Sequence, residues 1–318
     1  MRKVSILLPC YNEEKSLPLL YQALLKLMEK ERAYEWEVLF VNDGSNDNTL
    51  DIIKSLRQED NRINYLDLSR NFGKENAMLA GIDYVSGDGL VIMDADLQHP
   101  PMVISEMLKY WEKGYDDIYA KREDRGKESW FRKQFSLLFY KLLQKISRLE
   151  VPQNVGDFRL LDKSCINVLR NIRETERYSK GIFAWIGFNK KEITFKQSDR
   201  IAGKTSWSFL SLLSLAVEGI TSFTTAPLRL STIIGLCSSI TSFIYLVFVL
   251  VKTMVYGEAV PGYPTLVVLI LFLGGVQLFS IGIIGEYIGR IFKETKHRPP
   301  YIVKEYNDEK STPKNNES

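Results

Sequence analysis

Two aspartates follow an apolar run in the segment Val91-Ile-Met-Asp-Ala-Asp-Leu-Gln-His. In extended backbone, residues i and i+2 point to the same side, so Asp94 and Asp96 can reach one cation. Mg²⁺ is commonly held by one or two carboxylates together with phosphate oxygens, and Gln98 can add a neutral oxygen ligand. The segment predicts a site for a divalent cation and the phosphates of a nucleotide, although a solvated turn is the alternative for an isolated Asp-x-Asp pair.

A third carboxylate, Asp43, ends another apolar run in Val38-Leu-Phe-Val-Asn-Asp-Gly-Ser. We expect Asp43 to project into the same region as Asp94. A turn that also caps the next helix, through Ser45 or Asp47, would explain the same residues.

The first apolar run of the chain ends in Leu8-Pro-Cys-Tyr-Asn-Glu-Glu. Tyr11 offers an aromatic face to a nucleotide base, and Glu13 offers hydrogen-bond acceptors at the start of a helix. Capping of that helix would by itself explain the glutamates.

The apolar runs alternate with amphipathic stretches, which is typical of βαβ units around a mostly parallel sheet. The expected strands are residues 4–9, 37–41, 63–68, 90–93 and 117–120, and the expected helices are residues 13–30, 49–59, 74–85 and 102–113. Open α/β sheets bind ligands beyond the carboxyl ends of their strands, where these carboxylates fall. The pattern therefore predicts a nucleotide-binding α/β domain.

Composition excludes several classes of protein. The 318 residues are 45% hydrophobic and carry a net charge of only +3, which gives no argument for nucleic-acid binding. The three cysteines, Cys10, Cys165 and Cys237, are far apart and form no disulfide framework or metal-ligand spacing, as expected in a reducing compartment. The chain opens directly on a strand pattern, so we expect no signal peptide.

Two segments carry a helical stripe of aromatic and aliphatic residues. The first spans about residues 129–148, where basic residues interleave with the stripe, and the second spans residues 206–226. Such helices suit the surface of an anionic membrane, and a core-facing helix with a basic outer face is the alternative.

Residues 230–251 and 265–288 are nearly without charge and reach the length of about 20 residues that spans a hydrocarbon core. They predict two transmembrane helices rather than a buried hairpin. Arg229 precedes the first span and Arg290, Lys293, Lys296 and Arg298 follow the second, so both ends are expected on the cytoplasmic side. The polar tail at 307–318 predicts disorder.

Three motifs together resemble glycosyltransferase family 2, whose catalytic domain has the GT-A fold. They are Ser-Arg-Asn-Phe-Gly-Lys-Glu at 69–75, Asp-Ala-Asp-Leu-Gln-His-Pro-Pro at 94–101 and Gly-Asp-Phe-Arg-Leu-Leu-Asp at 156–162. With the paired membrane segments, the chain is most similar to the bacterial polyisoprenyl-phosphate glycosyltransferases, relatives of dolichol-phosphate mannose synthase. The resemblance covers most of the chain.

The resemblance implies roles for individual residues. Those implied to hold the base and ribose are Pro9, Tyr11, Glu13 and Asp43; those implied to bind Mg²⁺ or Mn²⁺ and the diphosphate are Asp94, Asp96 and Gln98. Asp157 corresponds to the carboxylate beside the acceptor, acting as a base or only orienting it. Arg200 and Lys204 match a basic loop that meets phosphates, although the order Gly203-Lys-Thr-Ser departs from the usual Gly-x-Ser-Lys and weakens the assignment of Lys204. A solvated basic loop is the alternative for both.

By the same resemblance, the expected reaction is inverting transfer of a hexose from a nucleotide sugar to a polyisoprenyl phosphate, for cell-envelope glycosylation. UDP-glucose and undecaprenyl phosphate are the first candidates, with UDP-N-acetylglucosamine and UDP-galactose as other donors. The enzyme is expected in the plasma (inner) membrane, with residues 1–205 as a cytoplasmic catalytic domain, 206–226 as an interface helix, 227–290 as a transmembrane hairpin and 291–318 as a cytoplasmic tail.

The sequence also permits other functions. A processive polysaccharide synthase shares the fold but usually carries Gln-x-x-Arg-Trp, which the chain lacks, and a dehydrogenase is disfavoured because no Gly-x-Gly-x-x-Gly follows the first strand. A catalytically inactive membrane scaffold would retain the fold without the activity. Small residues in both spans would permit contacts between subunits, so a homo-oligomer is left open.

Overall fold

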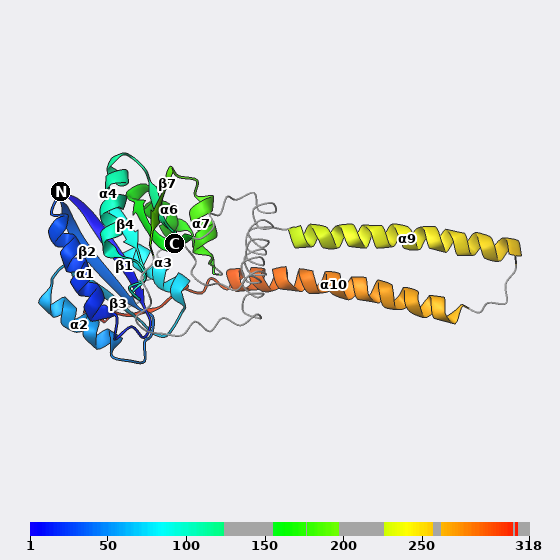
Figure 1. The fold of residues 1–318 in the computed structure, drawn as a ribbon. Helices are drawn as coiled ribbons and strands as arrows, with labels where there is room; N and C mark the ends of the chain where they lie inside the picture. Colours follow the sequence, from blue (N-terminus) through cyan, green and yellow to red (C-terminus); the bar gives the residue numbers. More distant parts are fainter. Residues whose placement is uncertain (124–154, 176, 197–225, 257–261, 308, 311–318) are drawn as a thin grey trace. The chain divides into compact units, whose positions relative to one another are not determined.

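The computed structural model describes residues 1–123, 155–175, 177–196, 226–256, 262–307 and 309–310. The chain divides into two compact units, one made of Met1–Phe209 and Arg298–Ser318 and the other of Leu210–His297 (Figure 1). Several predicted features lie outside the described residues: the interface helix at 129–148, residues 206–225 of the second interface helix, Arg200 and Lys204.

The first unit is built on a nine-stranded sheet in the order β7-β5-β6-β4-β1-β2-β3-β8-β9. The strands are β1 (Arg2–Cys10), β2 (Tyr34–Asn42), β3 (Ile63–Leu68), β4 (Gly89–Ile92), β5 (Asp117–Arg122), β6 (Val155–Asp162), β7 (Lys190–Phe195), β8 (Val303–Tyr306) and β9 (Glu309–Lys310). Pairing is parallel in β1–β2, β1–β4, β2–β3 and β5–β7. β6 and β8 run antiparallel to their neighbours. The sheet is therefore mostly parallel as predicted, with a reversed strand, β6, that the sequence analysis did not predict.

Four helices of this unit lie close to the predicted ranges: α1 (Leu17–Lys30), α2 (Thr49–Glu59), α3 (Lys74–Tyr84) and α4 (Ile104–Glu112). Two more, α6 (Lys163–Asn171) and α7 (Ser179–Trp185), were not predicted. α1 begins later than predicted because the four residues before it form a turn, in which the Ser16 amide donates to the Glu13 carbonyl at 3.1 Å. α4 follows a short 3₁₀ turn, Pro101–Val103, because prolines suit the first turn of a helix but not its interior.

The core lies on both faces of the sheet because successive side chains of a strand point to opposite faces. Val4, Ile6 and Leu8 of β1 pack in one cluster with buried residues of α1, α2 and α4. On the other face α3 lies against β1 so closely that a Cβ on Gly81 would stand 2.0 Å from a methyl group of Leu7. This contact sets how near α3, and the residues at its start, come to the sheet.

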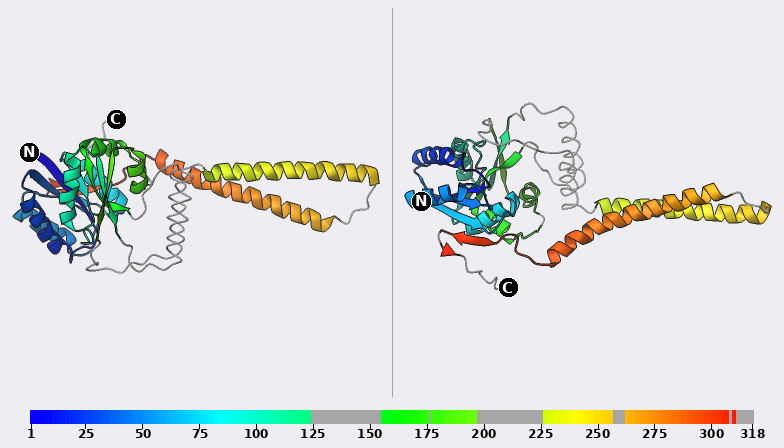
Figure 2. Two further views of the ribbon diagram at one scale, coloured as in Figure 1. Left: turned by 45° about the horizontal axis from the view of Figure 1, so that its top comes forward. Right: turned by 90° about the horizontal axis from the view of Figure 1, so that it is seen from below.

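The C-terminal segment returns to this sheet, contrary to the predicted disorder from residue 307 onward. β8 pairs antiparallel with β3, and Figure 2 shows it (red) along the edge of the sheet. The Tyr65 amide donates to the Asn307 side chain at 2.9 Å, and Lys54 and the Tyr65 hydroxyl both contact Glu305 at 2.7 and 2.6 Å. The prediction of disorder is thus wrong for Asn307, Glu309 and Lys310, because backbone pairing replaces the missing apolar anchors; residues 311–318 lie outside the described part.

The second unit contains two long helices, α9 (Ala226–Tyr256) and α10 (Tyr263–Thr295), which contact each other along a hairpin (Figure 2). Many of their large apolar side chains are exposed, including Phe243, Phe248, Phe272 and Leu278. Among the described residues, one helical stretch, Phe272–Thr295, is long and apolar enough to cross a membrane, while the apolar run Ser231–Tyr245 of α9 is shorter. The two predicted helices are present, and a full span by α9 stays a prediction.

Candidate functional site

The carboxyl end of β4 and the reversed strand β6 bring two predicted site residues together. The antiparallel register pairs Ile92 with Arg159. Continuing this register by two residues sets Asp94 opposite Asp157, although they are far apart in sequence. The predicted metal carboxylate and the predicted acceptor carboxylate therefore belong to one site.

Lys74, the first residue of α3, joins these two carboxylates. Its Nζ lies 2.5 Å from Asp94 Oδ1 and 2.6 Å from Asp157 Oδ2. The Lys74 side chain is 44% exposed, whereas the side chain of Asp157 is only 10% exposed. Lys74 thus pairs with one carboxylate that is partly exposed, Asp94, and with one that is nearly buried, Asp157.

The charges at this site influence one another. Burial favours the neutral form of Lys74, but Asp94 and Asp157 outweigh it and raise the pKa of the lysine. Burial also opposes ionisation of Asp157, yet the positive charges of Lys74, Lys180 and Arg159 lower its pKa to about 2. Asp157 is therefore an ionised carboxylate at neutral pH.

The turn that carries Asp94 and Asp96 is held by a buried histidine. The Asp94 amide donates to His99 Nδ1 at 3.2 Å, and the His99 ring stacks on Phe158, next to Asp157, at 4.8 Å between centroids. Burial lowers the pKa of His99, which keeps it neutral and able to accept this hydrogen bond. The Gln98 amide donates to Asp96 Oδ1 at 3.1 Å. His99 thus links the backbone of the turn to Phe158 of β6.

Asp43 holds the loop that leads to Lys74. Its two oxygens accept hydrogen bonds from the backbone amides of Phe72 and Gly73 at 2.7 and 2.9 Å, and burial raises its pKa. The next residue, Gly44, has φ of +66°, and a Cβ there would lie 2.5 Å from the backbone of Arg70, so only glycine fits. The structure gives Asp43 this supporting contact, and its contact with a nucleotide stays a prediction.

The other predicted nucleotide residues lie on the loop after β1. The Asn12 amide donates to Ser45 Oγ at 3.0 Å and the Glu13 amide to Thr49 Oγ1 at 2.8 Å, which ties this loop to the one after β2. Pro9, the last residue but one of β1, is half-buried, while Tyr11 is 45% exposed. These loops place Tyr11 where an aromatic ring can stack on a base, at the same edge of the sheet as Asp43.

The residues of the turn suit a divalent cation that arrives with phosphate. No cluster of three His, Cys, Asp or Glu side chains that could hold a metal occurs among the described residues. Asp94 and Asp96 supply hard carboxylate oxygens, and one or two carboxylates are enough for Mg²⁺ when phosphates complete the coordination. The donor set fits Mg²⁺ or Mn²⁺ shared with a diphosphate better than a metal held by protein alone.

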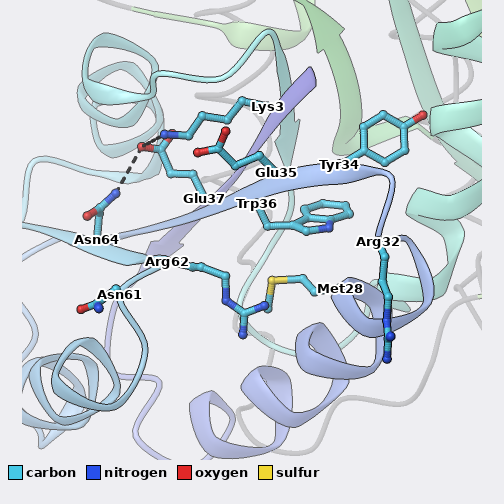
Figure 3. Close-up of a pocket in the computed structure, with 10 residues that line it drawn as sticks. All are labelled: Lys3, Met28, Arg32, Tyr34, Glu35, Trp36, Glu37, Asn61, Arg62 and Asn64. Atoms are coloured by element: carbon cyan, nitrogen blue, oxygen red, sulfur yellow. Dashed lines mark hydrogen bonds and ion pairs between the residues drawn. The ribbon is translucent and has the colours of Figure 1, made fainter. Parts of the chain in front are cut away.

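A separate hollow of about 460 Å³ lies at the opposite, amino ends of β1, β2 and β3 (Figure 3). Its lining includes Lys3, Tyr34, Glu37 and Asn64. The Glu37 carboxylate is already engaged, because it accepts hydrogen bonds from Ser86 at 2.9 Å and from Asn64 at 3.2 Å. None of the predicted site residues lines this hollow.

Three residues at this place had no predicted role. They are Lys74, His99 and Glu75, whose carboxylate accepts a hydrogen bond from the Ser179 amide at 3.0 Å. Lys74 was quoted within a motif but given no role. A signal was present, because a lysine in the first turn of a helix opposes the helix dipole and so suggests a compensating anion. His99 had no such signal, since its contact with the turn depends on Phe158 of β6.

The α/β sheet with carboxylates beyond its strand ends, followed in the chain by a helical hairpin, is the arrangement expected from the resemblance to glycosyltransferases. Comparison with known families supports this class: the model for glycosyl transferase family 2 matches residues 5–170, and the model for the GtrB C-terminal hairpin matches residues 226–291. The chain belongs to glycosyl transferase family 2.

Individual relatives align along nearly the whole chain. The protein CsbB of Bacillus subtilis (strain 168), named as a glycosyltransferase, is 44% identical over 315 residues, covering 99% of this chain and 95% of the relative. The bactoprenol glucosyl transferase of Shigella phage SfV is 43% identical over 302 residues, covering 95% and 98%. A prophage bactoprenol glucosyl transferase homolog of Escherichia coli (strain K12) is 42% identical with the same coverage.

Proposed function

We propose that this enzyme transfers a hexose from a nucleotide sugar to a polyisoprenyl phosphate, with UDP-glucose and undecaprenyl phosphate as its first candidate substrates. The observation that carries the proposal is the near full-length similarity to proteins named bactoprenol glucosyl transferase. The site supports it, because Asp94, one of the two predicted metal ligands, and Asp157, the predicted acceptor residue, both contact the ammonium group of Lys74.

In the proposed reaction an oxygen of the lipid phosphate attacks the anomeric carbon of the sugar. The bond from that carbon to the β-phosphate oxygen breaks on the opposite side, and the nucleoside diphosphate leaves with inversion. Asp94, Asp96 and Gln98 would hold Mg²⁺ or Mn²⁺, which supplies electrostatic stabilisation to the departing diphosphate. The Asp94 turn, fixed by His99, keeps these ligands in place.

Asp157 acts in this proposal by orienting the acceptor rather than by removing a proton. With its pKa held at about 2, it is a very weak base at neutral pH. The acceptor does not need a strong base, since the second pKa of a phosphate monoester is about 6 and its oxygen is already largely ionised. A hydroxyl acceptor would need such a base, so the depressed pKa favours a phosphate.

The membrane arrangement completes the proposal. The hairpin of α9 and α10 anchors the enzyme in the plasma (inner) membrane, with the catalytic unit and both termini in the cytoplasm. In this proposal Arg200 and Lys204 would meet phosphate groups, and the segments at 129–148 and 206–226 would bind the bilayer surface, as the sequence predicts.

The test is a transfer assay in membranes that contain the full-length protein. Radiolabelled nucleotide sugars are supplied one at a time, with polyisoprenyl phosphate or the matched polyisoprenol, and label is followed into the lipid fraction. We expect label from one donor, with phosphate required and with loss on chelation of divalent cations. Equal labelling of the polyisoprenol, or label only in a long polysaccharide, would contradict the proposal.

A further inference from the structure

The first two residues of α3, Lys74 and Glu75, contact different neighbouring segments. Lys74 contacts Asp94 and Asp157, while the half-buried carboxylate of Glu75 accepts hydrogen bonds from the amide of Ser179, at 3.0 Å, and from its hydroxyl. Ser179 begins α7, which packs against β6, the strand of Asp157. The Glu75 contact therefore ties the first turn of α7, which carries Lys180, to the start of α3, which carries Lys74.

Lys74 and Lys180 differ in the number of carboxylates that they contact. Lys74 has three N–H donors, of which two carboxylates take two, so one donor is left for a ligand, and its side chain is 44% exposed. Lys180 is half-buried and has no carboxylate partner within the described residues, yet its charge contributes to the low pKa of Asp157. Arg159 is different, because it is committed to a buried ion pair with Asp117 at 3.1 Å.

The second observation at this place is an unpartnered polar atom. Asp157 is 8% exposed, and its Oδ1 is buried with no hydrogen-bond partner in the described part of the chain. Buried carboxylate oxygens without a partner are costly, so the structure keeps an unused acceptor next to two unused donors. A phosphate monoester matches the two lysines, since its oxygens accept hydrogen bonds from them. The minor fraction that keeps one proton near neutral pH can also donate to Oδ1.

We propose that Lys74 and Lys180 form a subsite for the phosphate group of the acceptor, on the Asp157 side of the site. The proposal rests on the proposed function and names the residues that recognise its acceptor. The donor diphosphate arrives with its own cation at Asp94 and Asp96, whereas a phosphate monoester next to Asp157 needs cations from the protein to offset like-charge repulsion. The two lysines supply that charge.

The experiment compares Lys180→Gln and Lys74→Gln with Lys74→Arg and with a control, Lys109→Gln, on the exposed face of α4. The full-length protein is used in detergent. The KM for a polyisoprenyl phosphate is measured, and calorimetry gives the affinity for the donor's nucleoside diphosphate and for a short soluble prenyl phosphate. We expect Lys180→Gln to raise the acceptor KM about 10-fold or more and to weaken prenyl phosphate binding alike, as charge-assisted hydrogen bonds imply.

Lys74→Gln should weaken prenyl phosphate binding further and also lower kcat, with partial rescue in Lys74→Arg, while nucleoside diphosphate affinity stays near that of the parent protein. Lys109→Gln should change none of these values. A loss of nucleoside diphosphate affinity as large as the loss for prenyl phosphate in both variants would overturn the subsite, and so would unchanged prenyl phosphate binding in Lys180→Gln. Should Lys74→Gln fail to fold, Lys180→Gln decides.

The two proposals fail in different ways. If the parent protein binds prenyl phosphate through these lysines but transfers no sugar to it, the subsite stands and the proposed function is wrong. If the parent protein transfers sugar to the lipid phosphate and the lysine variants behave like the control, the function stands and the subsite is wrong. A parent protein that neither binds nor glycosylates a prenyl phosphate overturns both.

Discussion

The two ends of the parallel strands use their charged residues differently. At the amino ends, Glu37 accepts hydrogen bonds from Ser5 and Ser86. Figure 3 shows its contact with Asn64 and its ion pair with Lys3, at 3.7 Å. At the carboxyl ends, two carboxylates share a single lysine, and one oxygen of Asp157 has no partner among the described residues.

The contrast between Glu37 and the Asp94–Asp157 pair distinguishes a carboxylate that stabilises the fold from carboxylates that are available to a ligand. A buried carboxylate with several fixed donors stabilises the fold and has little capacity left for a ligand. Carboxylates that share one mobile ammonium group can exchange it for a substrate or a cation without disturbing the sheet. Variants at the two ends should therefore separate activity from stability.

The largest effect is expected for Asp96→Asn at the carboxyl end. The change removes one charge from the predicted metal ligands without changing size, and loss of such electrostatic stabilisation typically lowers kcat about 10²- to 10³-fold. Transfer to lipid is measured at saturating Mg²⁺ and Mn²⁺, with the thermal unfolding midpoint as control. Near-normal turnover in either metal would remove Asp96 from the site.

Asp157→Asn is expected to come next. Loss of its charge releases Lys74 and leaves the acceptor less well oriented, so kcat should fall about 10- to 100-fold, as for other positioning contacts. Calorimetric affinity for the nucleoside diphosphate should be unchanged, because that ligand is assigned to Asp94 and Asp96. A parallel loss of this affinity would instead place Asp157 in the donor site.

Glu37→Gln should show the reverse pattern at the amino end. An amide cannot accept from all the donors around position 37, and a buried unsatisfied group costs about 1–3 kcal/mol of stability. Thermal unfolding should shift down by several degrees while kcat and both KM values of the folded protein stay normal. A selective loss of activity would show that the amino end also takes part in the reaction.

The smallest effect is expected for Asn307→Ala at the sheet edge. It removes the side chain that accepts a hydrogen bond from the Tyr65 amide and donates one to the Asn64 side chain, at 2.9 Å each, and such bonds contribute about 1 kcal/mol apiece. A slightly lower unfolding midpoint and faster hydrogen exchange in β3 and β8 are expected, with normal transfer. Unchanged exchange in β8 would mean that the strand does not depend on this side chain.

Local features of the sequence were sufficient for much of the fold. Apolar runs with period 2 and helical stripes predicted β3 and α2 to the residue and placed the other parallel units within a few residues of their observed ends. Asp94 and Asp96 were found because a carboxylate pair at a strand end is a local pattern. The hairpin helices were found because nearly uncharged runs of that length are rare in other structures.

Contacts between distant segments could not be read in the same way. β6 has no turn or period that reveals its reversed direction, and that direction alone sets Asp157 opposite Asp94. The short strand β9 lies in the polar tail for which composition predicted disorder, whereas pairing of its backbone with β8 orders it.

What the sequence by itself determined is therefore the identity of the carboxylates, the order of the βαβ units and the family. Only the tertiary structure decided that Lys74 joins Asp94 to Asp157, that His99 fixes the turn and that Lys180 lies near the acceptor carboxylate. The physical reason is that periodicity and strand-end motifs are encoded over a few residues, while an ion pair depends on how separate elements pack. The type of each residue can be read from the sequence, but which residues contact one another depends on the packing of distant segments.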